Sequence, residues 1–212
     1  IWIDLLAPNK AQRTLIGQHY GLDLPDPEEL TDLEASARFY VEQNEIHIHS
    51  DFLLDREGKS RSVPVAFVLR GDILFSVRAE ELPVFRLQRL RARTQPGLVT
   101  DAKDLLLDLY GAEAEYSADA LESIYNELEA VSKNVLSQNV SDEDAERILA
   151  EIAEEEDLNG RIRRNMLDTQ RAVSFLIRRK LLSATQLEDA QQILRDIESL
   201  NSHTAFLFDK IN

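Results

Sequence analysis

Three long segments with helical spacing fill the second half of the chain, and they restrict its possible folds most strongly. They cover residues from about 100 to 138, from about 142 to 182, and from 184 to the end. Ser141 with Asp144 and Ser183 with Gln186 have the spacing of N-terminal capping boxes, the second as a full match. Each segment has roughly 30 to 40 residues, against about 12 in an average helix. We therefore expect these helices to pack against one another or to extend as a stalk.

The first hundred residues alternate between strand-like and helix-like patterns. "VPVAFVLRGDILFSVRA" predicts a hairpin, because two apolar runs flank Gly71-Asp72, a pair suited to a tight turn. We also expect strands in 37–42 and 45–54, followed by a polar loop at 55–62. Helices are expected in 7–21, where Gly21 ends the helix, and in 82–93. A further helix is expected in 24–36, with Asp26 as its N-cap and Pro27 at its first position.

The helix expected at 82–93 has two kinds of side chain on two sides. One side carries Val84, Leu87 and Leu90, and the other carries the arginines Arg86, Arg89 and Arg93. In an acidic chain these arginines are expected to pair with carboxylates or to face solvent.

The stretch "NEIHIHSDFLL" contains two histidines one residue apart, His47 and His49. Side chains at i and i+2 of a strand share a face, so both imidazoles project together, while Ile46 and Ile48 supply the apolar face. The spacing fits either a metal site or the solvent-facing side of a strand. A zinc site needs three or four ligands, so we favour the solvent-facing strand.

The charge balance excludes some partners. The chain has 39 acidic and 24 basic residues and a net charge of −15, which disfavours nucleic acids and anionic membrane surfaces and attracts cations. There is no cysteine, so disulfides and thiolate metal sites are excluded. No apolar run approaches the roughly 18 residues that span a bilayer, and we expect the chain as given to be soluble. The acidic run 154–157 is expected to be a solvated helix face.

Nothing in the sequence supports an enzyme. The motifs of P-loop, dinucleotide-binding, serine-hydrolase and zinc-protease sites are absent, and a cysteine nucleophile is excluded. The chain starts without Met inside an apolar run and ends inside a helical pattern. We expect it to be part of a longer protein.

Five stretches in order resemble the cytoplasmic part of the CorA family of magnesium and cobalt channels, in its enterobacterial-type branch. They are "EASARFYVEQNEIHIHSDF", "VRAEELPVFRLQRLRAR", "IYNELEAVSKNV", "NMLDTQRAVSFLIRR" and "QILRDIESLNSHTAFLFDKIN". The resemblance covers essentially the whole chain. The family's Gly-Met-Asn motif would follow the first membrane helix, beyond Asn212.

The resemblance implies an α/β fold with a stalk. It predicts a three-layer α/β/α domain with a mixed sheet in residues 1–99, then a long antiparallel helical hairpin packed on it in 100–182. Residues 183–212 would start a stalk helix leading to a transmembrane pore. The full-length protein would be a homopentamer in the inner (plasma) membrane, with this segment in the cytoplasm.

The resemblance also implies a regulatory magnesium site between neighbouring subunits. "ILRDIES" matches the stalk stretch with a sensing aspartate, which indicates Asp196, with Glu198 adjacent. The other side of the interface matches "PEELTDLEAS", which gives Asp32 as the best match. The alternatives in that stretch are Glu28, Glu29 and Glu34.

The function expected from the resemblance is that of a divalent-cation-sensing domain of a magnesium and cobalt channel, without enzyme activity. It would bind Mg²⁺ weakly and take Co²⁺ as a second ion. Two alternatives stay open: a zinc transporter domain of the same superfamily, and a helical protein-interaction scaffold with no ion role.

Overall fold

The computed structural model describes residues 1–27, 30, 35–56, 59–95, 97, 99–137 and 141–211. Five strands and six helices lie in these ranges. The strands are β1 (Trp2–Leu6), β2 (Phe39–Glu42), β3 (Glu45–Arg56), β4 (Lys59–Arg70) and β5 (Ile73–Arg78). The helices are α1 (Lys10–Tyr20), α2 (Ala35–Arg38), α3 (Pro83–Thr94), α4 (Ala102–Ser137), α5 (Asp142–Arg178) and α6 (Ala184–Ile211).

The strands form one mixed sheet in the order β1-β5-β4-β3-β2. β1 runs parallel to β5, and the other neighbours are antiparallel. The predicted hairpin is confirmed: Gly71, with φ of 56°, lies in the turn between β4 and β5. A positive φ is easily adopted by glycine, which has no Cβ.

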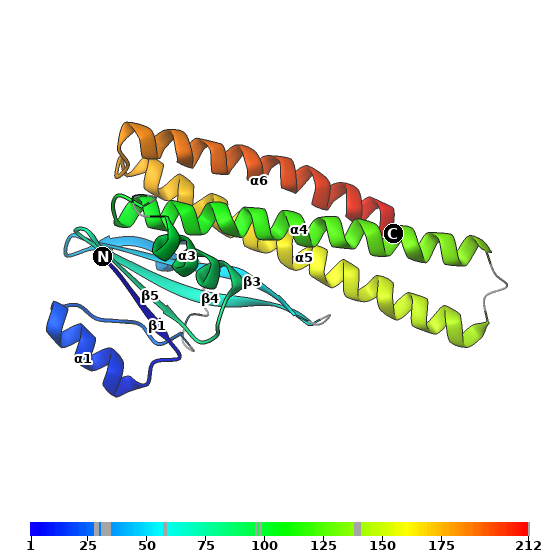
Figure 1. Cartoon of the computed structure of the whole chain (residues 1–212), viewed down its shortest axis with the longest axis horizontal. Coiled ribbons are helices and arrows are strands. Elements are labelled where there is room, and N and C mark those ends of the chain that lie inside the picture. The colour runs from blue at the N-terminus through cyan, green and yellow to red at the C-terminus, as the bar shows by residue number, and fades with distance from the viewer. Residues whose placement is uncertain are drawn as a thin grey trace.

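Helices cover both faces of the sheet, so the predicted α/β/α layering is confirmed (Figure 1). α1 packs on one face over a small core that includes Leu5, Val68 and Phe75. α3, α4 and α5 cover the other face, where Phe52, Phe67, Phe85 and Tyr110 form an aromatic cluster; these belong to the larger hydrophobic core.

The three long helices are confirmed with boundaries close to those predicted. α4 and α5 run antiparallel, and α6 lies on them on the side away from the sheet (Figure 1). α6 contacts them through one stripe with alternating steps of four and three residues: Gln186, Ala190, Ile193, Ile197, Leu200, Thr204 and Leu207. This heptad-like spacing places one narrow face of α6 against its neighbours.

Both helix starts predicted from capping spacing are present. The Ser183 Oγ accepts from the Gln186 N–H at 3.3 Å, and the Gln186 Oε1 accepts from the Ser183 N–H at 3.0 Å. At α5 the Ser141 Oγ accepts from the Asp144 N–H at 3.2 Å, but the Asp144 carboxylate accepts from the Ser141 hydroxyl instead of its backbone. Asp144 is shorter than the Glu of a full capping box.

Two local predictions are wrong. Residues 59–62 are strand, because β3 and β4 pair as far as Arg56 and Lys59 and leave little of the expected polar loop. The expected strand at 37–42 begins at Phe39, after the short helix α2. In α3 the buried residues are Val84, Phe85 and Gln88, whereas Leu87 and Leu90 are exposed. The helix expected from Pro27 extends outside the described residues.

Candidate functional site

α6 carries the two expected stalk carboxylates on its surface. Asp196 and Glu198 are both exposed, and in the described part of the chain neither forms an ion pair. The Asp196 Oδ1 accepts from the Gln192 Nε2 at 2.7 Å, and the Gln192 Oε1 accepts from the Arg195 Nη2 at 2.7 Å. Gln192 therefore orients the Asp196 carboxylate without neutralising its charge.

Helix geometry separates Asp196 from Glu198. Two residues apart on an α-helix means about 200° of rotation, so the two side chains leave nearly opposite sides of α6. One cation bound to the surface of α6 can therefore take only one of them from the same chain.

The other expected ligands, Asp32, Glu28, Glu29 and Glu34, lie outside the described residues. Among the residues that the structure does describe, no group of three or more His, Asp or Glu side chains is arranged to hold a metal ion. Of the expected ligands, the described part of one chain thus contains only Asp196 and Glu198, and both their role as ligands and the pairing with Asp32 stay predictions.

His47 is buried and has partners within the sheet. It is 7% exposed, its ring stacks on Tyr40 with centroids 4.6 Å apart, and its Nε2 lies 3.3 Å from the Glu45 Oε2. The predicted strand is correct, but the predicted solvent-facing position is wrong for His47, because Tyr40 on the neighbouring strand β2 covers it.

The acidic run 154–157 lies on α5 with Glu154, Glu156 and Asp157 exposed, as predicted. Glu155 is less exposed, and burial together with the charge of Glu127 raises the pKa of its carboxyl.

A buried polar cluster joins two of the stretches that carry the family resemblance. The Arg38 Nη2 lies 2.8 Å from the Asp168 Oδ2 and 3.4 Å from the Asp51 Oδ2, and the Arg38 Nε donates to the His49 carbonyl at 3.1 Å. The same Asp168 Oδ2 accepts from the Asp51 N–H at 2.9 Å. Desolvation by burial raises the pKa of Asp168 to about 6, against the opposing effect of Arg38.

Neither Arg38 nor Asp168 was among the residues expected to be functional. A signal was available, because Asp168 shares the buried face of α5 with Met166, Thr169 and Ala172, and a charged residue on such a face needs a partner. What the sequence does not contain is the identity of that partner, 130 residues away.

Comparison with known proteins assigns the family. The model of the family described as "CorA-like Mg2+ transporter protein" matches residues 1–212. The chain belongs to the CorA family. The chain is 43% identical over 213 aligned positions to the magnesium transport protein CorA of Salmonella typhimurium, covering all of this chain and 67% of that protein.

Two solved structures share this CorA-family fold. The CorA magnesium transporter of Methanocaldococcus jannaschii superposes with a TM-score of 0.81 at 15% identity, covering 99% of this chain and 66% of that one. The ZntB cytoplasmic domain of Vibrio parahaemolyticus gives a TM-score of 0.62 at 13% identity, with coverage of 99% and 85%. At such identities the likeness concerns the fold alone. None of the described helices combines the length and apolar character needed to cross a membrane.

Proposed function

We propose that this chain is the cation-sensing cytoplasmic part of a CorA-family magnesium transport protein. The observation that carries the proposal is the similarity over the whole chain to magnesium transport proteins at 43% identity. The exposed Asp196 carboxylate on α6 supplies an oxygen ligand of the kind that Mg²⁺ prefers.

The proposed site forms between copies of the chain. Asp196 of one copy faces Asp32, or one of Glu28, Glu29 and Glu34, of the next copy in a homopentamer, with Mg²⁺ between the carboxylates. Without the ion, two such charges 4 Å apart repel by about 4 kcal/mol at an effective dielectric constant near 20. Magnesium that binds only the closed assembly stabilises it by mass action, and its loss loosens the subunits.

Asp196 is the preferred ligand over Glu198 for a geometric reason. Its side chain is already oriented by Gln192, whereas no side chain of the described residues contacts the Glu198 carboxylate through a hydrogen bond or ion pair. Glu198, on nearly the opposite side of α6, would face a different neighbour.

The domain roles follow from the same proposal. Residues 1–99 and the hairpin 100–182 form the sensing body in the cytoplasm, and 183–212 start the stalk that leads to a pore in the inner membrane. The assignment to magnesium instead of zinc rests on the 41–43% identical relatives, which are magnesium transport proteins, since the likeness to the ZntB cytoplasmic domain is at 13% identity.

Metal titration of the full-length protein tests the ion class. An oxygen-only site with retained waters should bind Mg²⁺ with roughly millimolar affinity and Co²⁺ at the same site. Isothermal titration at fixed ionic strength measures both affinities. Submicromolar binding of Zn²⁺ that Mg²⁺ does not displace would contradict the proposal and favour the zinc-transporter alternative.

A further inference from the structure

One side of α5 is exposed over much of the helix, opposite the face that includes the buried residues Ile162, Thr169 and Leu176. Residues recur on this side at steps of three and four, the spacing with which one helix packs along another. We call this side the outer stripe of α5. It consists of Leu149, Ala153, Glu156, Gly160, Arg164, Leu167 and Arg171.

The outer stripe is symmetric about Gly160. Toward either end of the helix, the next residues of the stripe follow after four, three and four positions. In an antiparallel pair of α5 helices that meet at Gly160, each residue faces the one at the same distance on the other side of the glycine. Glu156 then faces Arg164 of the second copy, and Ala153 faces Leu167. An acidic side chain meets a basic one, and a small side chain meets a large one.

The described chain gives no packing reason for a glycine at position 160. Glycine in the interior of a helix is less stable than alanine at the same position. Apart from the backbone of α5 itself, a Cβ at Gly160 would meet no heavy atom of the described residues within 4 Å. A glycine on an exposed face does allow the backbone of a second helix to approach closely.

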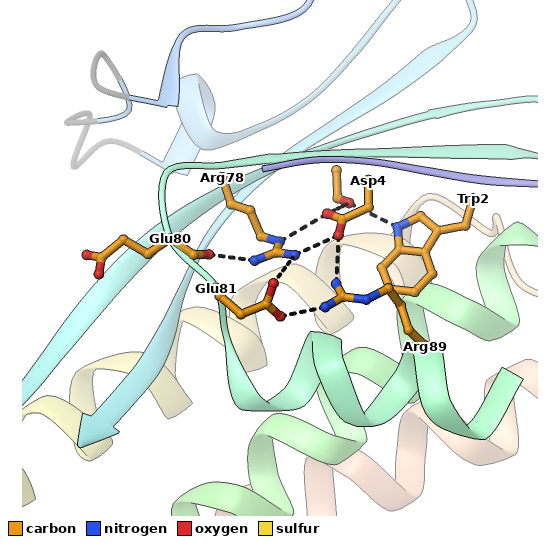
Figure 2. Close-up of polar contacts among 7 residues, drawn as sticks. Trp2, Asp4, Arg78, Glu80, Glu81 and Arg89 are labelled. Carbon is orange, nitrogen blue, oxygen red and sulfur yellow. Dashed lines mark hydrogen bonds and ion pairs between the residues drawn. The ribbon is translucent and has the colours of Figure 1, made fainter. Parts of the chain in front are cut away.

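The charges of the outer stripe are not matched within the described chain. Arginines at the start of the core have such partners: Arg78 and Arg89 share the carboxylates of Asp4 and Glu81 in the network of Figure 2. Both arginines of the outer stripe, and Glu156, are exposed and form no ion pair with a described residue. The basic half and the acidic half of the stripe therefore complement a second copy of the same stripe.

We propose that this chain binds a second copy of itself through the outer stripe, with the two α5 helices antiparallel about a two-fold axis at Gly160. The axis repeats every contact, so the pair of Glu156 with Arg164 forms twice. The contact also covers Leu149 and Leu167, which are 65% and 39% exposed. A parallel arrangement would place each charge opposite its own copy, where like charges repel, so the order of charges sets the orientation.

This two-fold contact differs from the contacts of the proposed homopentamer. Neighbours in a five-membered ring meet through two different surfaces, whereas the outer stripe meets itself. α6, which carries Asp196, packs on another side of α5, where the Asn159 Nδ2 donates to the Thr204 carbonyl at 3.0 Å. The pairing through α5 therefore needs no Mg²⁺, and either proposal can fail without the other.

Sedimentation equilibrium of the chain in EDTA tests the pairing. We expect wild type to show a monomer–dimer equilibrium with a dissociation constant below about 1 mM that rises with added salt. Glu156→Arg and Arg164→Glu each place like charges opposite one another and should weaken the pairing at least about tenfold. An equimolar mixture of these two variants should pair again, because two basic positions on one copy then face two acidic positions on the other. The chain with both substitutions should also pair.

Two controls separate the contact from general effects of charge and folding. Glu122→Arg on α4 and Arg86→Glu on α3, the same charge changes at exposed positions outside α5, should leave the dissociation constant unchanged. Gly160→Gln should weaken the pairing at least about tenfold without lowering the urea midpoint, because glutamine favours a helix over glycine.

Three outcomes would overturn the proposal. The first is a wild-type chain that stays monomeric up to about 1 mM, which would assign the outer stripe to a different partner. The second is self-association that Glu156→Arg and Arg164→Glu leave unchanged. The third is a mixture of these two variants that associates no better than either variant alone.

Discussion

Asp168 satisfies two donors with a single oxygen. Its Oδ2 binds both the Arg38 guanidinium and the Asp51 N–H, while its Oδ1 has no partner among the described residues. The carboxylate is 3% exposed, so water cannot replace the missing partner easily. The attraction of Arg38 is smaller than the cost of desolvation, and the pKa of Asp168 is therefore raised to about 6.

This pKa predicts a pH dependence of stability. An acid with a higher pKa in the folded chain binds protons more tightly when folded, so the chain gains stability as pH falls from about 6 to about 4. Two pH units correspond to about 3 kcal/mol for this one group.

Asp168→Asn removes the titration but keeps an oxygen for the Asp51 N–H. Urea titrations measure the unfolding free energy of wild type and of Asp168→Asn at each pH. As pH falls from about 6 to about 4, wild type should become more stable relative to Asp168→Asn. The same difference for the exposed Asp119→Asn should stay nearly constant; equal behaviour of the two variants would show that Asp168 is ionised at little cost.

At the scale of an element, β3 (Glu45–Arg56) is longer than its neighbour β2 (Phe39–Glu42). β2 pairs with β3 only from Glu45 to Ile48, which leaves the later N–H groups of β3 without a neighbouring strand on that side. Side chains of the long helices take its place: Asp168 accepts from Asp51, the Glu113 Oε1 accepts from the Leu53 N–H at 2.7 Å, and the Tyr116 hydroxyl lies 3.4 Å from the Asp55 nitrogen. The helices therefore close an open sheet edge as well as a hydrophobic face.

The edge closure predicts how two substitutions at Glu113 differ. Glu113 is fully buried, and burial raises the pKa of its carboxyl well above the usual range, which favours the neutral form of the side chain. Glu113→Gln keeps an acceptor and the volume and should cost less than about 1 kcal/mol. Glu113→Ala leaves the Leu53 N–H unpaired and a cavity behind, and should cost about 2–4 kcal/mol.

Urea unfolding measures both, with the exposed Glu115→Ala as a control that should change stability by less than about 0.5 kcal/mol. If Glu113→Ala and Glu113→Gln destabilise equally, the hydrogen bond to β3 contributes nothing measurable.

The elements differ in how far the sequence predicts them. The long helices and the Gly71 turn are local signals, from apolar spacing, capping residues and a glycine with positive φ, and they are confirmed. The burial of His47 depends on the pairing of Tyr40 opposite it in the β2–β3 pair, and the edge closure at Leu53 depends on Glu113, 60 residues further along the chain. The buried face of α3 also depends on tertiary contacts: Phe85 and Gln88 are buried by the sheet and α4, whose positions helical spacing alone does not give.

At the scale of the whole molecule, the sequence pattern of one chain predicts only one side of the candidate site. The spacing of α6 predicts that Asp196 lies off the buried stripe, and the structure shows it exposed. The second half of the site depends on a neighbouring copy and on Asp32, outside the described residues. An intersubunit ligand has no signature in the periodicity of one chain, so its identification rests on the family resemblance.

The most direct test of the proposed sensor is limited proteolysis of the full-length protein with Asp196→Lys. A lysine would replace the ion-dependent bridge by a fixed attraction to the neighbour's carboxylate. We predict that wild type is protected only when Mg²⁺ is present, and that Asp196→Lys is protected with or without it. Glu198→Lys, on nearly the opposite side of α6, should behave like wild type. Identical cleavage of wild type at zero and high Mg²⁺ would contradict the sensor, and an Asp196→Lys variant that still requires Mg²⁺ would contradict the assignment of Asp196.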